Sequence, residues 1–510
     1  MVNSSSALRG TGYPNSELVR VHSDNSPVTK QNGAEMIDLP NSMFSRRKVL
    51  GAAGIGAAGL AAGPLLSGCV GVGGTATQAG GGSAADAVTG TFDWKKAAGT
   101  TLHLLQTPHV YQQTYEPMLK DFTEKTGITV VADLVPEADY FTKLNTELAG
   151  GQGTHDVFML GAYWIWQYGP PGWLENLDPW LANESATAPE YDYEDIFEGL
   201  RTSMKWDFKL GSKLGTGGTY AIPWGFEINN IAYNKKVFDA KGIKLPDSFD
   251  NLIDLAVSLT DRTKNQYGIA FRGSRSWATI HPGFMSQFSR EGGVDYELKG
   301  DALTAAMNSD AAVTFTQKWA DLAKHAGPTS WTTYDYPQCT GDLGDGVAMM
   351  VYDADSATYP KNKPGASKMA GNLGWWAGPP GANGSYATNI WTWALGMNAK
   401  GKNKLAAYLF MQWASSKEAT TKAVQTGTLA DPPRKSVFNG AFKDSLGNFP
   451  GYLDAFEKVV AESKILFTPQ KKFLETTEDW AVALQDIYGG ANAKSRLDEL
   501  AASVTKKQTL

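Results

Sequence analysis

The sequence predicts an α/β protein built from two lobes, and three observations support this fold class. Short apolar strands alternate with amphipathic helices along most of the chain. We find no internal repeat, and the sequence has no second long apolar run beyond the one near its start. The chain after Cys69 is too long for one ordinary core but long enough for two.

The first folded elements predict a strand–helix–strand unit. Residues 101–106 (TLHLLQ) alternate like a strand, and 111–126 place apolar residues at helical spacing. Gly127 ends that helix, and 128–135 has the pattern of a second strand. A strand, a helix and a strand in this order indicate parallel strands in one sheet.

The later elements follow the same alternation. Two short strands and a helix are expected within 219–243. Further helices are expected at 141–148, 174–181, 250–259, 302–323, 403–413 and 451–465, and further strands at 155–162, 347–354 and 373–379.

The start of the chain predicts an export signal with a lipid attachment site. Arg46 and Arg47 precede a weakly apolar run, which is the twin-arginine arrangement of bacterial export signals. The tetrapeptide ending at Cys69 resembles a lipobox, whose cysteine is acylated and becomes the first residue. A retained membrane anchor or a core helix is the alternative, but the glycine-rich composition of 49–66 disfavours both. Translation from Met1 or Met43 stays open.

Composition excludes several classes of protein. The net charge is −6 and no basic run follows the signal, so nucleic acid is not an expected partner. If Cys69 carries lipid, Cys339 stands alone and the mature chain has no internal disulfide. The 16 Trp, 20 Tyr and 21 Phe fit carbohydrate binding, because an indole face matches the C–H face of a sugar.

No motif in the sequence predicts catalysis. The six histidines do not fall at metal-ligand spacings, and GxSxG, P-loop and strand-following GxGxxG motifs are absent. Among 52 carboxylates no local acid–base pair stands out. We therefore expect no catalytic residue, no metal and no cofactor.

From Thr100 to about Gly440 the chain resembles the extracellular solute-binding proteins of ABC importers, in the large carbohydrate-binding family (family 1). The order and spacing of several segments carry this resemblance: 115–130, 155–181, 219–259, 267–273, 288–293, 344–354 and 403–418. Four stretches are most similar to the branch that binds sorbitol, mannitol and related polyols or monosaccharides: 267–273, 325–331, 346–360 and 366–381.

This resemblance implies a fold of the periplasmic-binding-protein type, with two α/β lobes, a multi-strand hinge and a ligand cleft between them. It implies a monomeric, non-enzymatic protein that captures a sugar or polyol and delivers it to ABC permease subunits. The lipidated cysteine would hold it at the outer face of the cytoplasmic membrane. A surface-anchored carbohydrate-active enzyme, a glycosidase or a lyase, is the alternative.

The sequence patterns and the family resemblance together predict how the chain is divided. It comprises a polar extension (1–42), the signal (43–69), a flexible tether (70–97), an N-terminal lobe (98–222 and 343–385) and a C-terminal lobe (223–342 and 386–510).

Candidate ligand-binding residues are those that follow strands, because such loops line the crevice of α/β sheets. For each, an ordinary structural role (a turn, a packed aromatic ring or a buried ion pair) is the alternative. Those with amide, imidazole, carboxylate or guanidinium groups for hydroxyls are Gln106, His109, Glu227, Arg272 and Asp353. Those with an aromatic face for the ligand are Tyr163, Trp164, Trp224, Trp376 and Trp391.

Overall fold

The computed structural model describes residues 83–300, 302–426, 431–447 and 449–508. The expected extension, the signal with Cys69, and the tether up to residue 82 lie outside the described residues. Within the described ranges, no helix is both long and apolar enough to cross a membrane.

A five-stranded sheet organises the first part of the fold. In spatial order its strands are β2 (Thr129–Leu134), β1 (Thr101–Gln106), β3 (Val157–Gly161), β13 (Trp391–Met397) and β6 (Ile222–Glu227). β1 runs parallel to both β2 and β3, as the strand–helix–strand pattern predicts, whereas β13 is antiparallel to β3 and β6. β3 is buried along its whole length, which explains why its sequence is continuously apolar.

A three-stranded antiparallel sheet organises the second part. Its strands are β10 (Met350–Ala354), β7 (Asn229–Asn234) and β11 (Leu373–Trp376). The chain passes from β6 to β7 through the single residue Ile228. This pairing corrects the expected lobe boundaries: 343–385 joins β7 and not the sheet of β1, while β13 joins that sheet. Local patterns predict a strand but not its distant partner, which explains the error.

Short strand pairs complete the sheets. They are β12 (Thr388–Asn389) with β14 (Ser463–Lys464), β4 (Lys205–Trp206) with β5 (Gly218–Thr219), and β8 (Tyr296–Lys299) with β9 (Ala302–Ala305).

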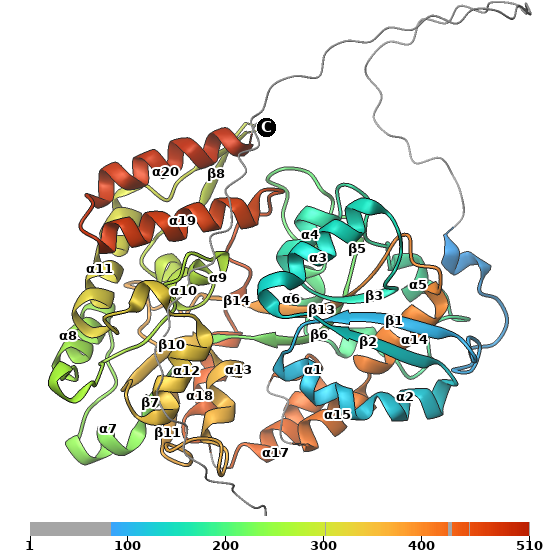
Figure 1. Ribbon diagram of the computed structural model, residues 1–510, viewed down its shortest axis with the longest axis horizontal. Coiled ribbons are helices and arrows are strands. Elements are labelled where there is room, and N and C mark those ends of the chain that lie inside the picture. Colours follow the sequence, from blue (N-terminus) through green and yellow to red (C-terminus); the bar gives the residue numbers. More distant parts are fainter. Residues whose placement is uncertain (1–82, 301, 427–430, 448, 509–510) are drawn as a thin grey trace, which may run out of the picture. The chain divides into compact units, whose positions relative to one another are not determined.

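Helices cover both faces of the five-stranded sheet. Figure 1 shows α3 and α4 on one face and α2 and α14 on the other. In the first part of the chain the helices are α1 (Val110–Tyr115), α2 (Leu119–Thr126), α3 (Glu137–Gly150), α4 (Ala162–Tyr168), α5 (Asp178–Ala182) and α6 (Glu198–Ser203). Two later helices, α14 (Lys404–Ala414) and α15 (Lys417–Gln425), follow β13.

The other helices all come after β7 in the chain. They are α7 (Lys235–Lys241), α8 (Phe249–Ser258), α9 (Trp277–Ile280), α10 (Gly283–Arg290), α11 (Asp310–Ala326), α12 (Tyr336–Asp345), α13 (Asp355–Thr358), α16 (Lys435–Val437), α17 (Lys443–Ser445), α18 (Tyr452–Val460), α19 (Phe473–Tyr488) and α20 (Ala493–Gln508).

Several expected helices differ from the structure. The helix expected over 451–465 ends at Val460 and is followed by β14, and two others differ for clear local reasons. The helix expected over 111–126 is two helices, α1 and α2, joined by a 3-10 turn that contains Pro117. Proline lacks the N–H that a continuous helix needs at that position. The helix expected over 302–323 begins instead at residue 310, because Ser309 caps α11 by accepting from the Ala312 N–H, and 302–305 forms β9.

Residues 83–97, which we expected to belong to a flexible tether, are packed against the folded chain. Asn183 donates from Nδ2 to the carbonyls of Ala85 (2.7 Å) and Val88 (3.0 Å). Trp94 donates from its indole to Glu190 at 3.2 Å. The tether expectation is therefore wrong for this part, because these side chains fix its backbone.

Candidate ligand-binding site

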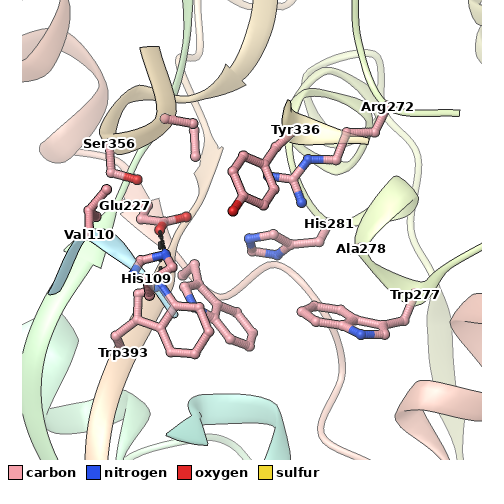
Figure 2. A pocket seen from close by; sticks show the side chains of 13 residues that line it. His109, Val110, Glu227, Arg272, Trp277, Ala278, His281, Tyr336, Ser356 and Trp393 are labelled. Atoms are coloured by element: carbon pink, nitrogen blue, oxygen red, sulfur yellow. Dashed lines mark hydrogen bonds and ion pairs between the residues drawn. The ribbon is translucent and has the colours of Figure 1, made fainter. Parts of the chain in front are cut away.

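Side chains from both main sheets line a small, partly open cavity of about 70 Å³. Its walls come from the ends of β6, β10 and β13 and from the segments that begin α1, α9, α12 and α13 (Figure 2). The lining residues are His109, Val110, Glu227, Arg272, Trp277, Ala278, His281, Tyr336, Ala354, Ser356, Ala357, Trp391 and Trp393.

Glu227, the last residue of β6, supplies a carboxylate to this cavity. Its Oε1 accepts a hydrogen bond from the Trp393 indole at 2.9 Å and lies 3.5 Å from His109 Nε2. Although burial opposes ionisation, the interaction with His109 keeps the pKa of Glu227 below its usual range. The group is therefore an ionised acceptor, and Oε2 has no recorded hydrogen bond within the described chain.

Arg272 lies across the cavity, held by a buried carboxylate. Its Nε donates to Asp353 Oδ2 at 2.9 Å and its Nη2 to Asp353 Oδ1 at 2.7 Å. Burial alone would lower the pKa of Arg272, but the charge of Asp353 and its hydrogen bonds raise this pKa above its usual value. Nη1 lies 3.8 Å from Asp335, which is too long for a direct hydrogen bond. One end of the guanidinium thus remains available to the cavity.

His281 is a second nitrogen-bearing group in the wall, and it is almost fully buried. Its Nδ1 lies 2.9 Å from the Tyr163 hydroxyl and 2.9 Å from Asn389 Nδ2. Its Nε2 is buried and has no partner among the described residues. Burial, and then the charge of Arg272, lower the pKa of His281 to about 3, so the ring is neutral near pH 7.

Indole rings form much of the apolar wall. Trp391 and Trp393 alternate along β13 and so lie on the same side of the strand. A Cβ on Gly161 would come within 2.1 Å of the Trp391 ring, so that position accepts only glycine while the ring stays in place. Trp277 lies 5.2 Å from Trp391, between ring centroids. The cavity therefore combines flat apolar faces with a few charged or polar atoms, a common pattern in small-molecule sites.

Four of the ten residues expected from the sequence to bind ligand line this cavity: His109, Glu227, Arg272 and Trp391. Two others support it from behind. Asp353 holds Arg272, and Tyr163 contacts His281 instead of offering a platform to the ligand.

The remaining four expected residues lie outside the cavity lining. Gln106 is buried at the end of β1, and Trp376 lies in β11 paired with β7. Trp164 stacks on Phe141 at a centroid distance of 3.7 Å. Trp224 packs against Tyr115 at 5.0 Å. Trp224 therefore fills core space, whereas Trp164 borders a neighbouring pocket of about 470 Å³ that shares Arg272 and Trp277 with the cavity.

Sequence reasoning missed four prominent lining residues: Trp277, His281, Tyr336 and Trp393. A signal existed only for Trp393, since the strand alternation that exposes Trp391 to one side also places Trp393 there. The other three lie on segments after Arg272 or before β10, and only the tertiary fold brings them to the cavity.

Asp355 and Asp431 form a buried pair of carboxyl groups, an arrangement that serves as acid and base in some enzymes. Asp355 and Asp431 both lie at the Tyr452 hydroxyl, at 2.8 and 3.1 Å. Burial raises the pKa of both, and their mutual repulsion raises that of Asp431 further. Neither lines the cavity. Their geometry is that of a buried structural cluster behind the site.

Comparison with known proteins identifies relatives of the whole fold. The family model described as bacterial extracellular solute-binding protein matches residues 107–421. The erythritol/L-threitol-binding protein of Mycolicibacterium smegmatis is 65% identical over 468 residues, covering 92% of this chain and 97% of that protein. The mannitol-binding protein of Pseudomonas aeruginosa is 24% identical over 306 residues, covering 59% of this chain and 66% of that protein.

A solved structure shares the fold. The solute-binding protein of an ABC transporter from Agrobacterium radiobacter K84, in complex with ribitol, superposes with a TM-score of 0.70 at 22% identity. The match covers 80% of this chain and 99% of that one. The expected two-lobed, periplasmic-binding-protein fold is confirmed, and the enzyme alternative is removed, since the family consists of transporter binding proteins. The chain belongs to the bacterial extracellular solute-binding protein family.

Proposed function

We propose that this protein captures a four-carbon polyol, erythritol or L-threitol, and delivers it to an ABC permease. The observation that carries this proposal is the 65% identity, over nearly the full length of both chains, to a protein named for binding these two compounds. The more distant mannitol-binding relative supports the wider class of acyclic polyols.

The size of the cavity supports a small ligand. A single water needs about 10–15 Å³ of such space, so about 70 Å³ holds only a handful of water-sized groups. A four-carbon chain with its hydroxyls is on that scale, whereas a disaccharide is far larger. The cavity therefore matches a tetritol in scale, although a neighbouring pocket of about 470 Å³ shares Arg272, Trp277, Ala278 and Tyr336 with it.

The chemistry of the wall suits hydroxyl groups. Glu227 is an ionised acceptor, and Arg272 keeps part of its guanidinium available as a donor. We propose that these two side chains, with His109 and the face of Trp391, contact the polyol. Hydrogen bonds to charged groups contribute about 1.5–3 kcal/mol each, enough to bind a small polar ligand tightly when several act together.

Calorimetric titration with a ligand panel tests the proposal. Erythritol and L-threitol should bind saturably and be recovered unchanged, while mannitol and maltose should bind at least about tenfold more weakly, because they are larger than the cavity of about 70 Å³. A ligand at 100 times its Kd should also stabilise the protein by about 2.7 kcal/mol. Absence of tetritol binding, or equal affinity for maltose, would contradict the proposal.

We further propose that Cys69 carries a lipid that holds the monomeric protein at the outer face of the cytoplasmic membrane, beside its permease. The twin arginines and the lipobox-like tetrapeptide support this. In cells, Cys69→Ala should lose incorporation of labelled fatty acid and leave the membrane fraction, while Cys339→Ala serves as a matched control. Labelled Cys69→Ala protein would refute the anchor.

A further inference from the structure

The observation that prompts a further inference is the unpaired Nε2 of His281. The side chain is 3% exposed, lines the cavity, and has no partner for this nitrogen among the described residues. Buried polar atoms of this kind are rare in native proteins, because each loses its hydrogen bond to water. Figure 2 shows the His281 ring directed into the space between Tyr336 and Glu227.

The hydrogen bonds of Asn389 determine which nitrogen of His281 carries the proton. Asn389 Oδ1 accepts from the Leu466 backbone N–H at 2.9 Å, so the amide orientation is fixed and Nδ2 must face the other way. Nδ2 carries only donor hydrogens, and it lies 2.9 Å from His281 Nδ1, 3.0 Å from the Tyr163 hydroxyl and 3.1 Å from the His281 carbonyl oxygen. A hydrogen on Nδ1 would face this amino group at 2.9 Å and be repelled by its hydrogens, so in the neutral ring the proton resides on Nε2.

The Tyr163 hydroxyl is consistent with the same assignment. It lies 3.0 Å from Asn389 Nδ2, from which it accepts, and 2.9 Å from His281 Nδ1, to which it can donate. Both neighbours of Nδ1 can therefore donate to it, and neither needs a proton from it. The low pKa of His281 keeps the second proton off the ring at neutral pH.

We infer that His281 is a specificity-determining residue of the ligand site, whose Nε2–H is a fixed donor for one hydroxyl of the bound polyol. Asn389 and Tyr163 are positioning residues that hold the required tautomer. This inference rests on the proposed function, and it adds a directional requirement. The ligand must offer a lone pair at His281 as well as a hydroxyl hydrogen at Glu227.

The requirement explains how the site can discriminate among small polar ligands. A hydroxyl satisfies both groups, because it accepts and donates at once. A ligand that lacks the oxygen at His281 leaves the buried Nε2–H unpaired, and sites built to hydrogen-bond a hydroxyl reject such analogues strongly. A methylene at this position should therefore bind much more weakly than a hydroxyl.

A cycle that combines ligand and residue changes tests this. Erythritol and its two monodeoxy analogues, lacking one inner or one terminal hydroxyl, are titrated into native protein and His281→Phe. In native protein at least one analogue should bind about 10–100-fold more weakly than erythritol. In His281→Phe that same analogue and erythritol should differ by less than about threefold, because the donor that distinguished them is gone.

His281→Gln is the matched control, since its amide keeps a donor directed toward the cavity. It should retain more of the native discrimination than His281→Phe, and thermal unfolding checks that both variants fold. Equal discrimination by native protein and His281→Phe would overturn the inference and leave the proposed function intact. Failure of native protein to bind erythritol would instead overturn the proposed function, and this inference with it.

Nitrogen NMR gives a second test. It uses native protein alone and so does not depend on whether a variant folds. In histidine-labelled protein, His281 should show a pyrrole-type Nε2 and a pyridine-type Nδ1 signal, with only Nε2 shifting strongly when erythritol is added. The reverse tautomer would overturn the inference.

Discussion

Two largely buried arginines, Arg272 at the cavity and Arg290 on α10, use their donors in opposite ways. Arg290 is fully engaged by the chain that leads into β12. It donates to the carbonyls of Ala377, Pro379, Tyr386 and Ala387 and to the Thr388 hydroxyl. Arg272 donates only from Nε and Nη2, both to Asp353, among the described residues. Its third nitrogen, Nη1, remains available, and the side chain lines the cavity.

This difference separates structural polar groups from those available to a ligand. Both side chains are charged, largely buried and well held, so burial and charge alone do not distinguish them. What distinguishes them is the number of donors left without a partner. Among the residues that line the cavity, unpartnered polar atoms also select Glu227 and His281; Asp431 Oδ2 is likewise without a partner among the described residues, but the Asp355–Asp431 pair does not line the cavity.

Arg272→Met should give the largest effect, because it removes a cavity donor and also leaves Asp353 buried without a partner. We expect a loss of about 3–5 kcal/mol in the free energy of unfolding and at least tenfold weaker binding of erythritol. Urea unfolding and calorimetry measure the two effects.

The double variant Arg272→Met/Asp353→Leu separates these contributions. Replacing both charges by apolar groups should restore most of the stability but none of the affinity. If the double variant binds erythritol with native affinity, Arg272 does not contact the ligand.

Arg290→Met should come next and act on stability alone. Losing several buried hydrogen bonds should lower the free energy of unfolding by about 3 kcal/mol, while the folded protein keeps its affinity for erythritol within about twofold. Arg262→Met is the control: that exposed arginine donates only to the Lys324 carbonyl, and its loss should cost less than about 0.5 kcal/mol. If Arg290→Met binds erythritol more weakly but is as stable as native protein, Arg290 acts on the ligand and the contrast with Arg272 is wrong.

Glu227→Gln should affect affinity alone, by about tenfold, or about 1.4 kcal/mol. The amide oxygen still accepts from the Trp393 indole, so the fold loses little. Glu190→Gln is a matched control, since Glu190 also accepts from an indole, that of Trp94, but away from the cavity. The assignment of Glu227 fails if both variants bind erythritol equally well.

The smallest expected effect lies in a titratable cluster away from the cavity. His155 lies between Glu147 (2.6 Å) and Asp133 (3.0 Å). Although burial opposes it, these carboxylates raise the pKa of His155 above 6.5.

A raised pKa means that the protonated His155 stabilises the fold below about pH 6.5 and that this contribution is lost as pH rises through the folded value. The stability difference between native protein and His155→Gln should therefore shrink by about 0.5–1 kcal/mol from pH 6 to pH 9, with Asp133 partly screened by solvent. Urea unfolding at several pH values measures it. If the stability difference between native protein and His155→Gln instead grows as pH rises, the pKa of His155 is not raised in the folded protein.

The sequence predicts the fold class, most strands and the region of the site, because these depend on local periodicity and on residues that end strands. Glu227 and Arg272 were identifiable for this reason. The lobe boundaries were not, since strand order depends on contacts between distant segments such as β13 and β3. Nor was His281, because its significance arises only from Asn389, more than a hundred residues away.

A crystal structure of the protein with erythritol tests the central claim most directly. The account predicts the polyol in the cavity, with one hydroxyl oxygen within hydrogen-bond distance of His281 Nε2 and another hydroxyl donating to Glu227. A polyol bound elsewhere, for instance in the surface groove lined by Trp94, Tyr191 and Trp413, with the cavity unoccupied, would contradict it.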